Sequence, residues 1–308
     1  MKTDAKRYLM LTLVIFFTLG FLWSCINQPI QDLTGDIIFS EIVSDHSLLT
    51  TYTLGGDSTQ QIPLRQSFIR PLYTANSEIV VGLSPMHGHS IGYPSYVMLE
   101  SGKVKKCVAN LYDSIIDDPR STNPYQVIVT GPLMIHAFDL ENCTLTEELY
   151  DLQKDSNPNI RSGRLLGATM SEDGETLFFG IGNYDGRAEP ASFSLIKMDI
   201  STGENKELEE GFYPSLSHDN LTLAFIKDNA LVLYDLPSGT IDYIHLFESV
   251  SYTFGPSIDW SLDDKLILVQ AININEDNFL QGSIFVYDLE TKEFRRVNAK
   301  GIYPSWIE

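Results

Sequence analysis

The first residues that could do chemistry lie between positions 87 and 92. Residues 88–92 read GHSIG and match the G-x-S-x-G pattern of the nucleophilic serine in α/β-hydrolases. That serine needs a strand directly before it and a helix directly after it. Pro94 opposes a helix here, and the chain has no alternating strand–helix pattern. We interpret the match as a chance occurrence in a loop, and we predict no catalytic residue.

Two further patterns resemble metal sites. His87 and His89 are one residue apart, and two imidazoles on one loop can converge on a metal ion. Zinc sites usually have three or four protein ligands, however, and the other histidines have no matching spacing. The acidic turns at Asp173, Asp219 and Asp263 lack the alternating oxygen ligands of a calcium loop. We therefore predict no metal site and no cofactor.

The acidic turns mark a repeat instead. Each has the pattern Ser-x-Asp, beginning at Ser171, Ser217 and Ser261, so the copies start 46 and 44 residues apart. An apolar run follows each turn, and a second phrase, such as residues 231–239 (LVLYDLPSG), follows that run. Apolar residues at every second position are typical of strands, and Asp with Ser or Thr and Gly is typical of turns. A period of this length predicts a repeat architecture.

Each repeat unit is interpreted as four strands, named A to D in chain order. Strand A carries Pro-Ser, strand B follows the Ser-x-Asp turn, strand C carries the Tyr-Asp-Leu phrase, and strand D leads out. The unit fits the chain six times. In the first unit, strands B, C and D are predicted at residues 36–41, 47–54 and 59–64. No amphipathic helix is predicted after residue 25.

The two ends of the repeat region indicate a closed ring. The first unit lacks strand A, whereas residues 301–308 (GIYPSWIE) form an A strand with no B strand after it. If this last strand completes the first sheet, no terminal repeat is left with an unprotected edge. An open β-solenoid would need capping units instead. The sequence therefore predicts an all-β fold over residues 35–308: a six-bladed β-propeller of four-stranded antiparallel blades, closed by the C-terminal strand.

The repeat resembles that of TolB-type propellers, which also occurs in the propeller domains of prolyl oligopeptidase relatives. The resemblance rests on the Pro-Ser strand, the Ser-x-Asp turn, the apolar strand and the Asp-Leu phrase. It is good over residues 165–308 and weaker over residues 35–150. The family usually has proline before the aspartate of the turn, where this chain has Glu172, His218 and Leu262. The resemblance implies the fold, and a fold does not determine a function.

The N-terminal residues predict export. Lys2, Lys6 and Arg7 precede an apolar run over residues 8–23, as in secretion signals. The run resembles the signal of bacterial lipoproteins, which implies lipidation at Cys25. An uncleaved membrane anchor and plain secretion are the alternatives. We expect a signal or anchor at residues 1–24, a linker at residues 25–34, and a protein anchored on the periplasmic or extracellular side of a membrane.

Charge and cysteine content limit the partners and leave one question open. The formal charge of -20 argues against nucleic acid, because phosphate binding needs a surplus of Lys and Arg. It also argues against loose adhesion to an anionic membrane, so membrane contact is expected only through the N-terminus. An exported location permits a disulfide between Cys107 and Cys143. The two lie in different units, and the sequence does not decide whether they pair.

Loop lengths suggest where recognition takes place. The B–C connections are long in units two, four and six, at about residues 84–93, 182–191 and 273–281. In a propeller all three would rise from one face, and loops on a rigid scaffold often carry function. Neutral surface insertion is the alternative. The predicted binding residues are His87, His89, Tyr93, Asn183, Tyr184, Asp185, Arg187, Asn275, Asp277 and Phe279.

These patterns together predict an exported, non-catalytic binding scaffold that recognises a protein or an envelope component. The alternative is a propeller-fold hydrolase or lyase acting in the central channel. Such an enzyme would gather His, Asp or Glu near Pro214, Pro256 and Pro304, whereas a channel lined by Tyr, Ser and apolar residues would argue against it. A purely structural envelope component is the third possibility.

Overall fold

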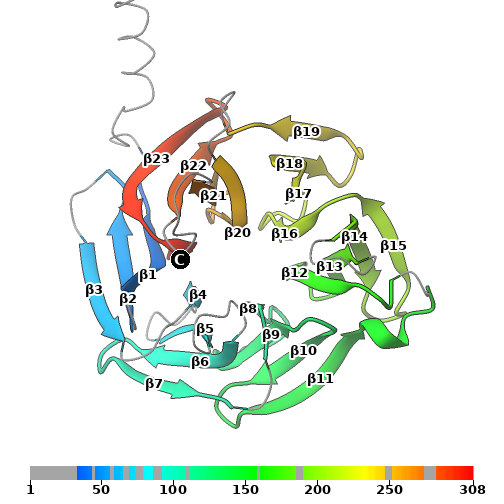
Figure 1. Ribbon diagram of the computed structural model, residues 1–308, viewed down its shortest axis with the longest axis horizontal. Coiled ribbons are helices and arrows are strands. Elements are labelled where there is room, and N and C mark those ends of the chain that lie inside the picture. Colours follow the sequence, from blue (N-terminus) through cyan, green and yellow to red (C-terminus); the bar gives the residue numbers. More distant parts are fainter. Residues whose placement is uncertain are drawn as a thin grey trace, which may run out of the picture.

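The computed structural model describes residues 33–43, 46–55, 59–64, 69–73, 79–85, 92–108, 111–157, 160–184, 190–246, 252–273 and 282–307. These residues form six four-stranded antiparallel sheets arranged as blades around a ring (Figure 1). The predicted six-bladed propeller is therefore confirmed. Within the described ranges, one turn of 3-10 helix (η1, Leu152–Lys154) interrupts the all-β pattern, and no helix is long and apolar enough to cross a membrane. Cys25 and the predicted signal lie outside these ranges and stay predictions.

The blades are numbered 1 to 6 along the chain. Blade 1 consists of β24 (Ile302–Ile307), β1 (Asp36–Val43), β2 (His46–Thr53) and β3 (Thr59–Leu64). Blade 2 consists of β4 (Ile69–Tyr73), β5 (Ile79–Pro85), β6 (Gly92–Met98) and β7 (Lys103–Lys106). Blade 3 consists of β8 (Ser114–Asp117), β9 (Gln126–Thr130), β10 (Met134–Asp139) and β11 (Thr144–Asp151).

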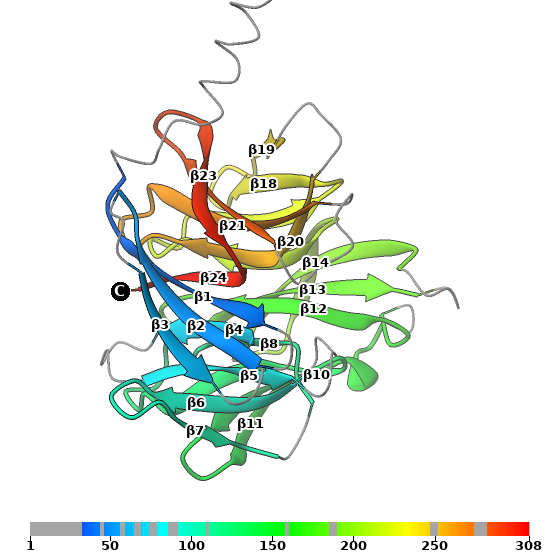
Figure 2. The same cartoon turned by 60° about the vertical axis from the view of Figure 1, so that its left-hand side comes forward.

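Blade 4 consists of β12 (Arg164–Met170), β13 (Thr176–Asn183), β14 (Ser192–Asp199) and β15 (Asn205–Glu209). Blade 5 consists of β16 (Phe212–Leu216), β17 (Thr222–Lys227), β18 (Ala230–Asp235) and β19 (Ile241–Ile244). Blade 6 consists of β20 (Tyr252–Trp260), β21 (Leu266–Asn273), β22 (Ser283–Asp288) and β23 (Glu293–Lys300). The first strand of each unit lies near the ring centre and the fourth lies at the rim (Figures 1 and 2).

The C-terminal strand closes the ring, as predicted. β24 pairs antiparallel with β1, so that Trp306 lies opposite Ile37 and Ser305 lies opposite Ile38. The Trp306 side chain is 6% exposed and packs in one cluster with Ile37 of blade 1 and Val286 of blade 6. One strand from the end of the chain therefore completes the first sheet and also contributes to the contact between the first and last blades.

The hydrophobic core lies between the blades. Each cluster of buried side chains among the described residues is centred on a pair of neighbouring blades; one of them joins Leu49 of blade 1 to Val80 and Val97 of blade 2. The middle strands are buried on both faces because each is packed between two other blades. Burying one such aliphatic side chain contributes about 1.5–3 kcal/mol, so the contacts between blades are a large source of stability.

The three Ser-x-Asp segments are structural turns. The hydroxyl of Ser171 donates to Asp173 Oδ1 at 2.5 Å, and Ser171 Oγ accepts the backbone N–H of Thr176 at 2.9 Å. The turns beginning at Ser217 and Ser261 make the same two contacts. The serine thus holds the aspartate and closes the hairpin between strands A and B, which explains why the motif recurs with the blade period.

The open question about the cysteines has a clear answer. Cys107 follows β7 of blade 2, and Cys143 lies in the turn between β10 and β11 of blade 3. The two sulfur atoms form a disulfide, with the Cα atoms 5.2 Å apart. The bond joins the outer part of one blade to the next, which spacing along the sequence could not reveal.

Candidate functional site in the central channel

The channel is shaped by irregularities in the strands around the axis. The pairing of strands A and B shifts register in five blades, through β4, β12, β16, β20 and β24. In three of these strands a residue with positive φ precedes a proline: Arg70 at 51°, Tyr213 at 53° and Tyr303 at 52°. A bulky side chain in this region is uncommon, and a following proline disfavours it further. The surrounding blades must hold these strained positions in place.

The three strained residues meet at the bottom of the channel. The guanidinium carbon of Arg70 lies 4.7 Å from the centre of the Tyr303 ring and 5.7 Å from the centre of the Tyr213 ring. Such cation–π contacts stabilise the charge by about 0.5–2 kcal/mol each. Burial raises the pKa of the Tyr213 hydroxyl to about 12, so this group stays neutral. We call these three residues the channel floor.

An ion pair lies next to the floor. The Arg164 guanidinium donates to Asp113 Oδ2 at 3.1 Å, and Asp113 is 7% exposed. Burial raises the pKa of the Asp113 carboxyl, although the charges of Arg70 and Arg164 oppose that shift. Among the described residues, Asp113 Oδ1 and the Nε atoms of both arginines are buried without a hydrogen-bond partner. One acceptor and two donors of this cluster therefore form no hydrogen bond with the described residues.

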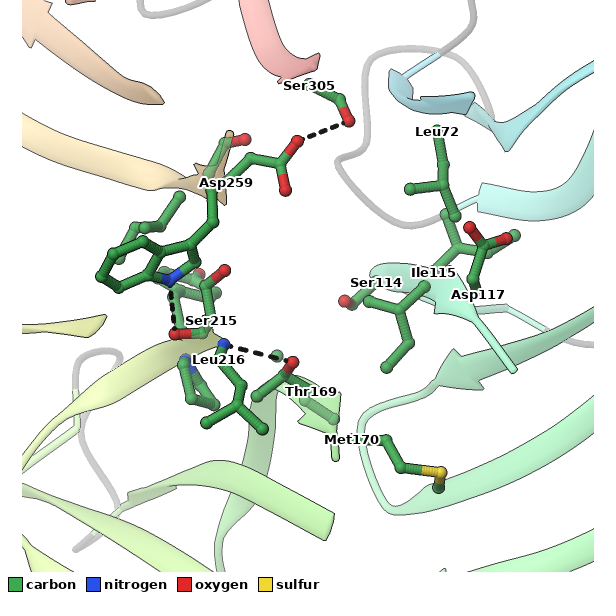
Figure 3. Close-up of a pocket in the computed structure, with 18 of the residues that line it drawn as sticks. Leu72, Ser114, Ile115, Asp117, Thr169, Met170, Ser215, Leu216, Asp259 and Ser305 are labelled. Atoms are coloured by element: carbon green, nitrogen blue, oxygen red, sulfur yellow. Dashed lines mark hydrogen bonds between the residues drawn. The ribbon is translucent and has the colours of Figure 1, made fainter. Parts of the chain in front are cut away.

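A cavity of about 310 Å³ lies above the floor. It opens on the side where strands A turn into strands B, because Glu172, His218 and Asn220 of those turns line it. Its walls combine prolines and apolar side chains with small hydroxyls (Figure 3). The labelled wall residues in that view are Leu72, Ser114, Ile115, Asp117, Thr169, Met170, Ser215, Leu216, Asp259 and Ser305.

Several polar groups in the cavity wall connect neighbouring blades. Asp259 Oδ2 accepts the Ser305 hydroxyl at 2.7 Å and the backbone N–H of Trp306 at 2.8 Å (Figure 3). Trp260 Nε1 donates to the carbonyl oxygen of Ser215 at 3.1 Å. At the mouth, His218 Nδ1 lies 3.0 Å from Asp264 Oδ1. These acidic and imidazole groups are used to hold the ring together, and in the described part of the chain no three His, Cys, Asp or Glu residues are placed to hold a metal ion.

Comparisons with known proteins agree on the fold. No protein-family model matches the sequence, and no curated protein matches it either. TolB from Acinetobacter baumannii superimposes with a TM-score of 0.60 and 13% identity, over 88% of this chain and 66% of that one. This chain has a TolB-like propeller fold. It spans about two thirds of the length of that TolB chain.

Other solved structures show how widely this fold is used. A chain of a nidogen/laminin complex has a TM-score of 0.62 at 9% identity, covering 89% of this chain and 98% of that one. An oligogalacturonate lyase from Vibrio parahaemolyticus has a TM-score of 0.50 at 15% identity, covering 86% and 74%. At these identities the likeness shows the TolB-like fold alone, since the same fold occurs in a lyase and in a protein complex.

The described strand ends that flank the three predicted loops lie on the other face of the ring. The three long connections join β5 to β6, β13 to β14 and β21 to β22, as the sequence predicted for alternate blades. Successive strands of a blade run in opposite directions, so B–C connections and A–B turns lie at opposite ends. The central cavity therefore opens away from the face that carries the predicted loops.

Three of the ten predicted loop residues are described. Tyr93 is half-buried in β6, with Lys106 Nζ 5.6 Å from its ring centre. Asn183 ends β13 and donates to Ser192 Oγ at 3.4 Å, and Tyr184 follows it, half-buried. Within the described residues the loop prediction is thus neither confirmed nor contradicted. The predicted residues that lie outside them are His87, His89, Asp185, Arg187, Asn275, Asp277 and Phe279.

Sequence reasoning missed the channel floor. Tyr213 and Tyr303 each precede a Pro-Ser pair and were visible as part of the strand A phrase. Arg70 precedes Pro71 in the same structural position, but Leu72 replaces the serine, so the phrase is incomplete. An alignment of the four inner strands that contain a proline, β4, β16, β20 and β24, would have placed Arg70 beside the two tyrosines.

Proposed function

We propose that this chain is a non-catalytic binding scaffold whose central cavity receives part of another molecule. The observation that carries the proposal is the shape of the channel: Arg70, Tyr213 and Tyr303 form a floor, and the cavity above it opens at the A–B turns. A concave, mostly preformed site with apolar walls and a few polar groups is typical of ligand recognition. The partner would be a protein or an envelope component.

The character of the cavity wall supports binding over catalysis. The wall near Pro214, Pro256 and Pro304 consists mainly of Ser, Tyr and apolar residues. Asp259, the acidic residue closest to them in sequence, is already held by Ser305 and by the backbone of Trp306. A general base must be able to reach and accept a substrate proton, and an engaged carboxylate is poorly suited to that task. A hydrolase or lyase acting in the channel remains the alternative function.

A blocked cavity tests the proposal. In Figure 3 the Ser114 hydroxyl points into the cavity, so Ser114→Trp should fill it. The matched control is Leu145→Trp on the outer strand β11, where the native side chain is 45% exposed. Both variants would be compared with the wild type by crosslinking in envelope extracts and quantitative mass spectrometry. We expect Ser114→Trp to lose captured partners that Leu145→Trp retains; identical capture by both variants would contradict a role for the cavity.

We also propose that the scaffold is exported and held at a membrane through Cys25. The support is the basic and apolar N-terminal sequence, which resembles a lipoprotein signal. Fractionation of cells that express wild type or Cys25→Ser, together with acyl labelling, tests the anchor. We expect Cys25→Ser to lose both the acyl label and the membrane association. A variant that stays membrane-bound without the label would favour a retained helix instead.

A further inference from the structure

At the channel floor itself, two guanidinium groups face a single carboxyl. The guanidinium groups are those of Arg70 and Arg164, and the charges of both act on the Asp113 carboxyl. Asp113 Oδ2 already forms an ion pair with the Arg164 guanidinium, 3.1 Å from one of its terminal nitrogens. A guanidinium does not lose its proton in proteins, so at least one positive charge remains whatever the state of Asp113. This charge lies at the centre of a chain whose formal charge is -20.

Arg70 also has hydrogen-bonding capacity to spare. Its Nε atom is buried and has no hydrogen-bond partner among the described residues. The rings of Tyr213 and Tyr303 stabilise the charge through their π faces, but a π contact does not satisfy the N–H donors of the guanidinium. Arginine presents these donors in a planar fork that matches a carboxylate. Arg70 is half-buried and lines the cavity, so an incoming carboxylate would add a negative charge and acceptor oxygens beside its guanidinium.

The mouth of the cavity has the opposite electrostatic character. Glu172 lies exposed in the turn at the mouth, and Asp117 and Asp259 line the wall, while Arg70 lies at the floor. A ligand must therefore bring its negative charge to the tip and carry neutral or basic groups behind it. A polyanion that crossed the mouth would be repelled by these carboxylates.

The walls indicate what kind of chain carries the carboxylate. Leu72, Ile116 and Met170 offer apolar surface, while Ser114 and Ser215 offer small hydroxyls. Apolar surface with scattered hydrogen-bonding groups suits a peptide, whose main chain bonds to hydroxyls and whose side chains pack on the apolar patches. The cavity of about 310 Å³ has room for the end of a peptide rather than for a folded element.

We propose that the central cavity binds the carboxylate-bearing tip of a peptide segment, with Arg70 as the anion-binding residue of the floor. The inference rests on the proposed scaffold function and names the chemistry of the partner. The carboxylate can be a C-terminus or an acidic side chain, because both present the same planar pair of oxygens. The strained backbone of Arg70 and its stacked tyrosines fix the guanidinium before the ligand arrives, which lowers the entropic cost of binding.

Defined small probes test the inference on the full-length chain. The probes are N-acetyl-Ser-Leu with a free C-terminus, the same dipeptide as its C-terminal amide, N-acetyl-Ser-Asp as its C-terminal amide, and a uronic acid disaccharide. Binding is followed by NMR titration. We expect the free acid to bind at least about tenfold more tightly than the leucine amide, in line with a charge-assisted hydrogen bond. The aspartyl probe shows whether a side-chain carboxylate is accepted as well.

Variants of Arg70 test whether the preference for the free acid over the amide depends on the channel floor. In Arg70→Gln the preference for acid over amide should disappear, and Arg70→Lys should retain part of it, because the charge stays but the fork is lost. Arg295→Gln is the matched control, since it removes an arginine from the outer strand β23 of blade 6. Thermal unfolding of each variant shows whether the fold is intact.

The results distinguish a failure of the peptide-carboxylate inference from a failure of the scaffold proposal. Equal affinity for acid and amide in the wild type, no detectable binding of any peptide probe, or tighter binding of the uronic acid disaccharide would overturn the peptide-carboxylate inference. If Ser114→Trp still abolished partner capture in any of these cases, the scaffold proposal would stand. Acid-selective peptide binding that needs Arg70, in a protein whose capture is unaffected by Ser114→Trp, would support the inference and refute the wider proposal.

Discussion

Blades 4 to 6 and blades 2 and 3 are joined to their neighbours by different kinds of contact. In blades 4 to 6 the Ser-x-Asp turns reach across blade boundaries. Asn220 of blade 5 accepts the backbone N–H of Glu172 in blade 4 at 3.0 Å. Asp264 of blade 6 accepts the backbone N–H groups of His218 and Asp219 in blade 5, at 2.8 and 2.9 Å. The last residue of each turn thus satisfies donors of the preceding one.

Blades 2 and 3 lack this turn and are held differently. The Cys107–Cys143 disulfide connects them covalently. At the boundary with blade 4, the Arg120 side chain lies against Gly174 and is held in place by ion pairs within blade 3, to Asp118 at 2.9 Å and to Glu147 at 2.8 Å. The comparison shows that the repeated motif carries part of the inter-blade contact. Where the motif is absent, individual side chains perform the same task.

We expect the largest loss of stability from a substitution in β24, the strand that links blade 1 to blade 6. Trp306→Ala would leave a cavity between blades 1 and 6 and weaken ring closure. We expect it to lower the free energy of unfolding by about 3–5 kcal/mol, as for other large buried aromatic side chains. Urea unfolding measures the change, and Leu145→Ala on the exposed edge of β11 is the control. A loss below about 1 kcal/mol would show that closure does not depend on this strand.

Removing the Cys107–Cys143 disulfide tests how blades 2 and 3 are held together. The double variant Cys107→Ala with Cys143→Ala removes a crosslink between residues separated by 36 positions. A loop of this length predicts a loss of about 3–4 kcal/mol. Urea unfolding is measured with and without a reductant. Reductant should destabilise the wild type and leave the double variant unchanged, whereas an insensitive wild type would mean that the bond contributes little.

The fold could be predicted because its signals are local. Alternation and turn residues determine each strand, and the predicted strand at residues 59–64 coincides with β3. Ring closure was predicted from the unmatched A strand at the end of the chain, and β24 confirms it. These signals need neither distant contacts nor side-chain geometry, so a single sequence contains them.

The cavity could not be predicted because it depends on distant strands meeting at the axis. Arg70 and Tyr303 are separated by most of the chain and become neighbours only when the ring closes. The pairing of Cys107 with Cys143 likewise depends on how two adjacent blades are aligned. The Ser-x-Asp motif in turn directed the search toward the loops on the other face, because it specifies the hairpins and not the channel floor.

A substitution in the turns tests the C-terminal half. Asp264→Ala removes the acceptor of two backbone N–H groups, and its side chain is 18% exposed. We expect a loss of about 1.5–3 kcal/mol, because hydrogen bonds to a charged group are stronger than neutral ones. Asn220→Ala, which removes a neutral acceptor at the preceding boundary, should cost about 0.5–1.5 kcal/mol. Equal losses in urea unfolding would show that neither the charge of Asp264 nor its additional contacts, a second backbone N–H and His218 Nδ1 at 3.0 Å, add stability.

The smallest expected effect is a loss of stability in acid. The pH at which this loss begins should differ between blade 3 and the C-terminal blades. His136 in β10 of blade 3 is 5% exposed, and burial lowers its pKa below the ordinary value, despite the nearby charge of Glu148. The unfolded chain therefore binds the proton more readily. The stability due to neutral His136 is present above about pH 6.5 and is lost as the pH falls toward the depressed folded pKa.

We expect the urea midpoint of the wild type to fall between pH 7.5 and 5.5, and to fall less in His136→Leu. His245→Leu is the control, because His245 is exposed. In the C-terminal half, the pKa values of Asp173 and Asp235 are lowered, mainly because a serine hydroxyl donates to each carboxylate. Their contribution is present above about pH 4 and is lost only as the pH falls through the lowered values. If His136→Leu and the wild type lost stability equally by pH 5.5, acid sensitivity would not begin at this buried imidazole, and this distinction between the two halves would be wrong.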